Sequence, residues 1–304
     1  MGIWNLDKFF HPEAIAVIGA SEQPGRIGTA LMGNLIRGGF TGRLLPVNPK
    51  YPQIMGLPAA SSVGQLDAVV DLALVAVPIH QVPESIEQCA AVRIKTAIVI
   101  SSGGKEIGES GLMIEERIQK AAMAGGIRIL GPNCLGVMVP GSKLNASFTA
   151  DMPNAGNLAF VSQSGGICTA ILDMSFQAGI GFSHFVSMGS MLDIDFGDMI
   201  DYLGRDSAAK SILLYVEQLS NIRKFMSAAR AVSRIKPIIV LKAGSSTAGA
   251  KVASSHTGAL AGEDAIYDAA FRRAGVIRVG TIEELFDSAE LTAKQPRPTG
   301  PHLV

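Results

Sequence analysis

Short β-rich runs alternate with amphipathic helical patterns along the whole 304-residue chain, and this alternation restricts the folds that the chain can adopt. It is the signature of parallel sheets with helices on both faces. The length is sufficient for two domains of ordinary size, each with its own core. We therefore predict an α/β protein with two parallel-sheet domains in tandem, at residues 1–144 and 145–296.

The apolar runs of the first half predict five strands, with helical patterns between them. The strands are expected at 14–18, 44–47, 72–77, 97–100 and 127–130, and two of the helices at 84–92 and 112–123. A polar stretch with Gly and Pro follows at 137–156, which is typical of a connection between domains. We place the domain boundary there, between residues 144 and 145.

The second half repeats the alternation and ends in a different kind of segment. Strands are expected at 158–161, 182–186, 212–216, 238–241 and 276–279, and helices at 167–177, 196–203, 222–233, 264–274 and 282–293. Residues 297–304 are interpreted as the remainder of a Pro-rich linker and the start of a truncated next domain. This predicts a fragment of a longer protein; the alternative is a natural frayed terminus.

Composition excludes several classes of partner. Lys+Arg 26 balances Asp+Glu 26, whereas proteins that bind nucleic acids or membrane surfaces favour a basic excess. No apolar run reaches the roughly 18–20 residues that span a bilayer, and we find no signal peptide. The 3 cysteines have no metal-ligand spacing. We expect a reduced, cytoplasmic protein with no nucleic-acid partner, no membrane partner and no metal ligands.

A Gly-rich turn follows the first predicted strand and precedes a helix. Such a turn lets the backbone approach a phosphate, and the helix N-terminus supplies N–H donors. On its own this is a weak signal for a nucleotide. The candidate binding residues here are Gly19, Ala20, Ser21, Gly25, Arg26 and Gly28.

The end of the second strand indicates which nucleotide is bound. A dinucleotide-binding domain places an acid there to hold the ribose, but this strand is followed by Asn48, Pro49 and Lys50. A cation in that place disfavours NAD. It fits an extra phosphate on the ribose, as in NADP or coenzyme A. The alternative for Lys50 is a solvated loop lysine.

Three later strand ends carry Gly, Ser, Pro and other small or polar residues. Ligands of open α/β sheets bind outside the carboxyl ends of the strands, so we expect a long ligand across this edge. For Cys134 a small buried residue is favoured over a catalytic thiol. The candidate residues are Val77, Pro78, Ser101, Ser102, Gly103, Asn133 and Cys134.

The first strand of the second half leads into a Ser- and Gly-rich turn and then a helix. Free N–H groups and Ser hydroxyls at a helix N-terminus form a good cradle for phosphate. Ordinary capping explains Ser164 alone but not the whole set. The candidate phosphate-binding residues are Ser162, Gln163, Ser164, Gly165 and Gly166.

A run of small residues at 243–262 carries His256 and separates a strand from a helix. A connection this long is either functional or disordered, and an imidazole on it suits a covalent phosphoryl carrier. The alternative is a linker with an incidental histidine. Glu217 ends a nearby strand, where its carboxylate can fix the tautomer of His256; a common strand-end charge is the alternative.

Two acids and four further histidines complete the inventory of reactive side chains. Asp193 and Asp195 are candidates to line the same pocket as Glu217, although an N-cap role is favoured for Asp195. We assign no role to His11, His80, His184 and His302.

Taken in order, these segments resemble the NDP-forming acyl-CoA synthetases, of the ADP-forming acetyl-CoA synthetase type, and more distantly the succinyl-CoA synthetase α subunit. The resemblance covers essentially the whole chain. It rests on residues 17–21 (VIGAS), 47–50 (VNPK), 131–136 (GPNCLG), 161–166 (VSQSGG), 215–217 (YVE) and 255–262 (SHTGALAG).

The resemblance implies a Rossmann-like CoA-binding domain followed by a flavodoxin-like ligase domain. It implies the reversible conversion of acyl-CoA, phosphate and ADP into a small carboxylic acid, CoA and ATP. It also implies that His256 is the phosphohistidine, that Glu217 supports it and that residues 162–166 hold phosphate. The family's site for ADP or ATP and Mg²⁺ lies in an ATP-grasp domain, which this sequence lacks, so an ATP-grasp domain or subunit is the expected partner.

Two other interpretations stay open at this point. The same domains occur as CoA- or acyl-CoA-sensing modules of protein lysine acetyltransferases, where the histidine can be absent. An NADP-dependent oxidoreductase fits the first Gly-rich turn but leaves the His256 segment unexplained. The sequence names neither the acid nor the choice between ADP and GDP, and the oligomeric state, a homo-oligomer included, is open.

Overall fold

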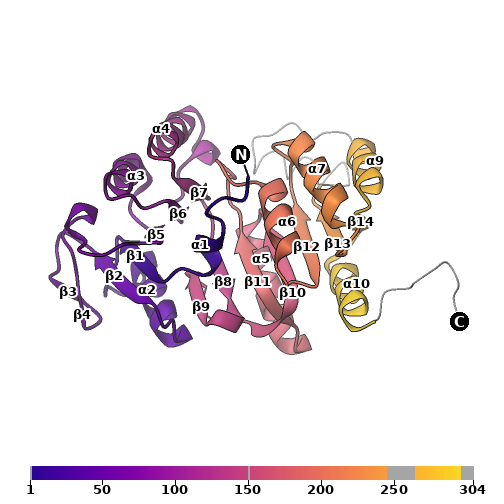
Figure 1. Ribbon diagram of the computed structural model, residues 1–304, viewed down its shortest axis with the longest axis horizontal. Coiled ribbons are helices and arrows are strands. Elements are labelled where there is room, and N and C mark those ends of the chain that lie inside the picture. The colour runs from indigo at the N-terminus through magenta and orange to yellow at the C-terminus, as the bar shows by residue number, and fades with distance from the viewer. Residues whose placement is uncertain (1, 150, 245–263, 296–304) are drawn as a thin grey trace, which may run out of the picture.

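The computed structural model describes residues 2–149, 151–244 and 264–295, which form two α/β units side by side (Figure 1). The first is a five-stranded sheet in the order β2-β1-β5-β6-β7. All neighbouring strands in it are parallel, as predicted. The strands are β1 (Ala14–Ile18), β2 (Arg43–Val47), β5 (Leu72–Val75), β6 (Thr96–Val99) and β7 (Arg128–Leu130).

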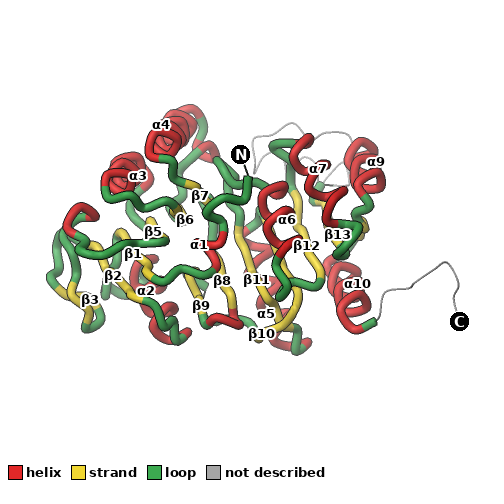
Figure 2. Tube along the Cα trace, viewed as in Figure 1, coloured by secondary structure: helices red, strands yellow, loops and turns green. Residues whose placement is uncertain are grey.

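Helices cover both faces of this sheet because successive side chains of each strand point to opposite sides (Figure 2). Ile15 and Val17 belong to one buried cluster, and Ala16 and Ile18 to another. The helices are α1 (Asp7–Phe10), α2 (Ile27–Gly38), α3 (Val82–Ala91) and α4 (Glu109–Gly125). Short elements complete the unit: β3 (Gln53–Ile54), β4 (Leu57–Pro58), η1 (Val63–Gln65), η2 (Ile79–Gln81) and η3 (Lys105–Ile107).

The second sheet has seven strands in the order β14-β13-β12-β10-β11-β8-β9. Its five predicted strands pair in parallel. They are β10 (Asn154–Ser162), β11 (Gly181–Ser187), β12 (Ser211–Val216), β13 (Ile238–Lys242) and β14 (Ile277–Val279). The helices of this unit are α5 (Gly165–Ala178), α6 (Phe196–Arg205), α7 (Ile222–Val232), α9 (Asp264–Ala274) and α10 (Ile282–Lys294).

The interpretation of residues 137–156 as a polar connection is wrong. The segment contains β8 (Gly136–Val139), η4 (Pro140–Ser142), β9 (Leu144–Ser147) and the start of β10. β8 pairs antiparallel with β11 and β9, so the second sheet is mostly rather than wholly parallel. The polar side chains of β9 are buried and hydrogen-bonded to each other: Ser147 Oγ donates to Asn145 Oδ1 at 2.6 Å. Polarity therefore did not imply exposure here.

The chain passes from one sheet to the other between β7 and β8, and the two units share a core. One continuous apolar cluster contains Leu31 and Leu35 of α2 as well as Leu144 and Ala146 of β9. The boundary between residues 144 and 145 stays a prediction. No helix of the described residues has the length and apolar composition needed to cross a bilayer.

Candidate functional site

A cavity of about 380 Å³ lies where the strand ends of the first sheet face the N-terminus of α5. It brings together residues from both predicted binding regions. From the first unit come Ser102, Asn133 and Cys134, and from the second come Gln163, Ser164, Gly165, Gly166 and Glu217. Side chains that the sequence did not single out also line it, among them Ile27, Lys105, Glu106, Phe148, Ser190 and Gln218.

The Gly-rich turn after β1 packs closely against its neighbours. Gly19 has a φ of +89°, and a Cβ there would lie 2.8 Å from the carbonyl oxygen of Ala76. A Cβ on Gly28 would lie 2.0 Å from the carbonyl oxygen of Gly19. These contacts let α2 begin directly behind the turn, with Ile27 at the cavity wall. Only glycine permits so close an approach of backbone to backbone.

The side chain of Asn48 joins two of the predicted binding segments. Its Nδ2 donates to the carbonyl oxygen of Ala20 at 2.7 Å, and its Oδ1 accepts from the backbone N–H of Lys50 at 2.9 Å. Lys50 and Pro49 are exposed. The turn residues Ser21, Gly25 and Arg26 precede α2, whose N-cap makes no side-chain hydrogen bond. Backbone N–H groups in the first turn of α2 therefore have no side-chain cap to satisfy them.

The ends of β5 and β6 are tied together beside the cavity. The hydroxyl of Ser101 donates to the carbonyl oxygen of Val77, just before Pro78, at 2.5 Å. Gly103 has a φ of +108° and donates its N–H to Glu106 Oε1 at 2.7 Å. Lys105 Nζ crosses to the second unit and donates to the carbonyl oxygen of Ser190 at 3.1 Å. Lys105 follows two glycines at a strand end, and this placement was the signal that could have identified it.

Cys134 is a buried neutral thiol, which confirms the favoured alternative for it. Its side chain is 3% exposed, and burial raises the pKa of the thiol to about 12. Its Sγ donates to the carbonyl oxygen of Val99 at 3.4 Å. The preceding residue, Asn133, adopts a φ of +57° and donates its N–H to the carbonyl oxygen of Ser101 at 3.0 Å.

The turn before α5 combines a cap with open helix N–H groups. Ser164 caps the helix, because its Oγ accepts from the N–H of Ile167 at 3.4 Å, so the capping interpretation is confirmed. Ser162 is fully buried and bonds within the turn, accepting from the N–H of Ser164 at 3.1 Å. Gly165 and Gly166 follow, and a Cβ on Gly166 would meet nothing within 4 Å. The first turn of α5 thus opens onto the cavity.

Gln163 has a structural contact that the sequence did not indicate. Its Oε1 accepts from the N–H of Glu217 at 2.8 Å and from that of Gln218 at 2.9 Å. This side chain therefore holds the end of β12 against the turn before α5. Glu217 lies at the cavity wall as a result. His256 lies outside the described residues, so its contact with Glu217 stays a prediction.

The prediction that Asp193 and Asp195 line the same pocket as Glu217 is wrong. Both line a second cavity, together with Trp4 and Arg128. Asp193 Oδ2 accepts from Arg128 Nε at 2.8 Å. Asp195 Oδ1 accepts from the N–H of Gly197 at 2.8 Å, which confirms the N-cap role at α6. The loop that follows β11 lines the first cavity at Ser190. Its later residues Asp193 and Asp195 are held in the second cavity by ion pairing and helix capping.

Two family models match consecutive parts of the chain. A CoA-binding domain matches residues 13–140, and the succinyl-CoA ligase-like flavodoxin domain matches residues 155–292. The ADP-forming acetate–CoA ligase I of Archaeoglobus fulgidus is 44% identical over 95% of this chain and 42% of its own length. The α subunit of the ADP-forming acetate–CoA ligase I of Pyrococcus furiosus is 42% identical over 99% of this chain and 66% of its own length.

The chain belongs to the NDP-forming acyl-CoA synthetase family. A solved structure agrees with this assignment: the dinucleotide-forming acetyl-coenzyme A synthetase 1 of Ca. Korarchaeum cryptofilum, in complex with phosphate and ADP, matches with a TM-score of 0.93 at 38% identity. The match covers 97% of this chain and 64% of that chain. This member of the synthetase family therefore spans less than two thirds of the relatives it matches.

Proposed function

We propose that this chain is the CoA-binding and phosphohistidine-bearing part of an NDP-forming acyl-CoA synthetase. The observation that carries the proposal is the shared cavity. Strand-end residues of the CoA-binding unit and the N-terminus of α5 line one space of about 380 Å³. A thioester held by the first and a phosphate held by the second would meet there. The ligase names of the relatives favour this function over a sensing module or an oxidoreductase.

In this proposal CoA lies along the carboxyl edge of the first sheet. The turn at residues 19–28 and the first N–H groups of α2 receive its phosphates, because a helix N-terminus attracts anions. Lys50, exposed beside that turn, pairs with the 3′-phosphate. The ends of β5, β6 and β7 then direct the thiol end of CoA toward Ser102 and Asn133 at the cavity wall.

The proposed chemistry proceeds in three transfers. A phosphate oxygen attacks the thioester carbonyl, the C–S bond breaks, and CoA and an acyl phosphate form. A ring nitrogen of His256 then attacks phosphorus, and the acid leaves with the bridging oxygen. The phosphoryl group finally passes to ADP, which restores the imidazole and yields ATP. The N–H groups of Gly165 and Gly166 are suited to hold the phosphate, and Glu217 to orient His256.

The last transfer requires a part that these residues do not supply. We propose that an ATP-grasp domain or subunit binds ADP or ATP with Mg²⁺, and that His256 reaches it after phosphorylation. CoA or acyl-CoA, phosphate and a small carboxylic acid are the remaining substrates. Mg²⁺ would offset the charge on the nucleotide phosphates during this transfer.

Calorimetric titration with CoA, 3′-dephospho-CoA, NAD and NADP tests the first half of the proposal. CoA should bind, and Lys50→Ala should weaken CoA by about 1–3 kcal/mol while leaving 3′-dephospho-CoA nearly unchanged, because a charge-assisted bond is lost. Equal weakening of both ligands would remove Lys50 from the 3′-phosphate site. Binding of NADP in place of CoA would overturn the proposal.

Phosphorylation by acetyl phosphate tests the second half. The wild-type chain should acquire an acid-labile, alkali-stable phosphoryl group, and His256→Ala should abolish it while leaving CoA binding intact. His80→Ala is the matched control, because His80 is exposed on the first unit and lies far along the chain from His256 and from residues 162–166. Full labelling of His256→Ala would exclude this histidine as the carrier. Unchanged labelling of Glu217→Gln would remove the role assigned to Glu217.

A further inference from the structure

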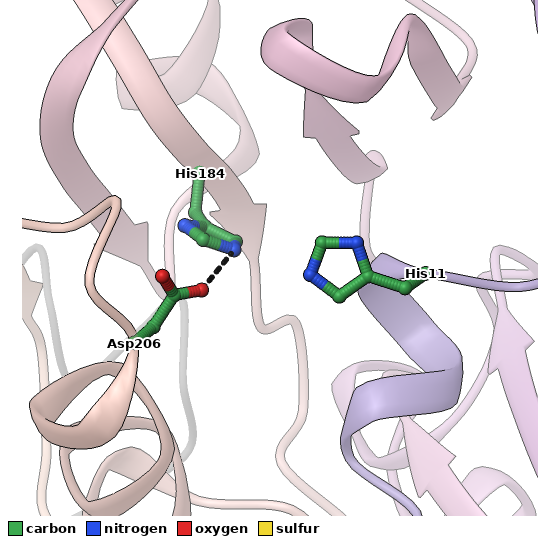
Figure 3. A group of neighbouring side chains, drawn as sticks. All are labelled: His11, His184 and Asp206. Carbon is green, nitrogen blue, oxygen red and sulfur yellow. Dashed lines mark ion pairs between the residues drawn. The ribbon is translucent and has the colours of Figure 1, made fainter.

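Three side chains from separate elements converge on the side of the second sheet that faces α1 (Figure 3). His11 is the C-cap of α1, His184 lies on β11, and Asp206 is the C-cap of α6. One ligand atom from each lies within 4.8 Å of the others. His184 Nε2 and Asp206 Oδ2 lie 3.3 Å apart.

Neighbouring groups orient two of these side chains. Asp206 Oδ1 accepts from the backbone N–H of Ala208 at 2.7 Å, which leaves Oδ2 directed at His184. The other ring nitrogen of His184, Nδ1, lies 3.2 Å from Ser183 Oγ. The ring of Phe10 packs edge-on against the His184 ring, with centroids 5.0 Å apart. The contact of Nδ1 with Ser183 is typical of a histidine that binds a metal through its other ring nitrogen, which here is Nε2.

Nε2 of His184, the ring nitrogen that faces Asp206, has an unusual environment. The side chain is 1% exposed, and Nε2 makes no hydrogen bond with any part of the chain that the structure describes. A cation bound between Nε2 of this buried ring and the carboxylate of Asp206 would give both groups a partner.

Lys236, whose charge acts on His184, does not fill that place. Lys236 Nζ donates to the carbonyl oxygen of Leu203 at 2.7 Å and also to that of Asp206. It therefore satisfies the C-terminal carbonyls of α6 rather than the carboxylate of Asp206. Its charge disfavours a second cation nearby, which sets a limit on affinity.

We propose that His11, His184 and Asp206 form a binding site for a divalent transition metal of the zinc type. Two imidazoles and one carboxylate are the donors that Zn²⁺ accepts, and three protein ligands leave a fourth position for water. Zinc bonds of about 2.0–2.1 Å separate tetrahedral ligand atoms by about 3.3 Å, the distance already present between His184 and Asp206. His11 is exposed and has to approach by no more than about 1.5 Å.

A metal bound at this site would link the N-terminal segment to the second unit. His11 belongs to the N-terminal segment, whereas His184 and Asp206 belong to the second unit. A bound metal would therefore hold α1 against β11 and α6, beside the stacked rings of Phe10 and Tyr202, whose centroids are 4.8 Å apart. The site contains no residue of the cavity that carries the proposed ligase function, so the two proposals can fail independently.

Titration of the chelator-treated, tag-free chain with Zn²⁺ and Co²⁺ tests the proposal. We expect one saturable site by calorimetry, visible Co²⁺ absorption bands of tetrahedral type and a higher melting temperature with Zn²⁺. His11→Ala removes an exposed ligand, and Asp206→Asn keeps an oxygen for Ala208 N–H. Each should weaken Zn²⁺ binding roughly 10-fold or more. His80→Ala removes another exposed histidine and should bind as the wild type does.

Two results would overturn the proposal. One is the absence of saturable binding by the wild-type chain. The other is equal binding by the wild type, His11→Ala and Asp206→Asn, because this would assign the metal to other histidines of the chain. CoA binding by each variant, measured in parallel, reports whether the fold is retained.

Discussion

Two Gly-rich turns, one after β1 and one after β10, look alike in sequence but use their glycines for different reasons. In the first turn a Cβ on Gly28 would lie 2.0 Å from the carbonyl oxygen of Gly19. In the second turn a Cβ on Gly166 would meet nothing within 4 Å. The first glycine is required by packing of the chain on itself. The second leaves an open approach to the helix N-terminus, where a ligand can bind.

The N-caps of α2 and α5, the helices that follow these two turns, also differ. Arg26, the N-cap of α2, makes no side-chain hydrogen bond, whereas Ser164 caps α5 with its hydroxyl. A side-chain cap therefore stabilises the N-terminus of α5, whereas close packing of the backbone positions the N-terminus of α2. Substitutions in the two turns should therefore separate stability from ligand binding.

Gly28→Ala should have the largest effect on stability. The new methyl group would collide with the backbone of Gly19 and displace α2, at a cost of about 2–4 kcal/mol in the free energy of unfolding. Urea denaturation measures this loss. A cost below about 0.5 kcal/mol would show that the turn adapts easily and that the comparison between the two turns is wrong.

Gln163→Met should come next. It removes the oxygen that accepts from the N–H groups of Glu217 and Gln218, at 2.8 and 2.9 Å. Leaving partly buried donors without a partner costs about 1–3 kcal/mol. Gln163→Glu keeps an acceptor oxygen and is the matched control. If both variants unfold at the same urea concentration as the wild type, the contact does not stabilise the end of β12.

Ser164→Ala should have a smaller effect, because the cap that it removes is long at 3.4 Å. We expect a loss of about 0.5–1 kcal/mol in the free energy of unfolding. Ser164→Asp restores a cap but places a negative charge at the cavity. It should keep wild-type stability and lose affinity for phosphate, measured by calorimetry. Retained phosphate affinity in Ser164→Asp would argue against an anion site at α5.

Gly166→Ala should change stability least and in the opposite direction. Gly166 lies in the first turn of α5 with open space around it, so alanine should stabilise the chain by no more than about 0.5–1 kcal/mol. Phosphate affinity should fall if the anion approaches this backbone. Thermal unfolding and phosphate titration of the same sample test both parts, and a destabilised Gly166→Ala would remove the contrast with Gly28.

The features that the sequence predicted correctly depend on residues that are close together along the chain. Strand β1 was predicted with its observed ends, Ala14 and Ile18, because an uninterrupted apolar run is typical of a strand buried on both faces. The cap by Ser164 and the cap by Asp195 also depend only on residues within one turn. In contrast, the polar residues of β9 suggested a loop, because the elements that bury this strand are remote in sequence. One of them is α2, whose Asn34 donates to the backbone carbonyl oxygen of Ser147.

The same difference applies to the candidate site. Each strand-end group was recognisable along the chain, since glycines, serines and a helix start follow one another there. The contacts of Gln163 with the end of β12, 54 and 55 residues away, were not. Nor was the convergence of His11, His184 and Asp206, because isolated histidines carry no spacing that predicts a common site.

The order of apolar and polar residues was enough to predict the alternating α/β architecture, and the residues at the strand ends carried the resemblance to the family. These properties depend on neighbours along the sequence. Only the tertiary structure decided that β8 and β9 join the second sheet, that both predicted binding regions contribute to one cavity and that α1 reaches β11. Those outcomes depend on which distant surfaces bury each other, and local patterns contain no information about the partner of a buried face.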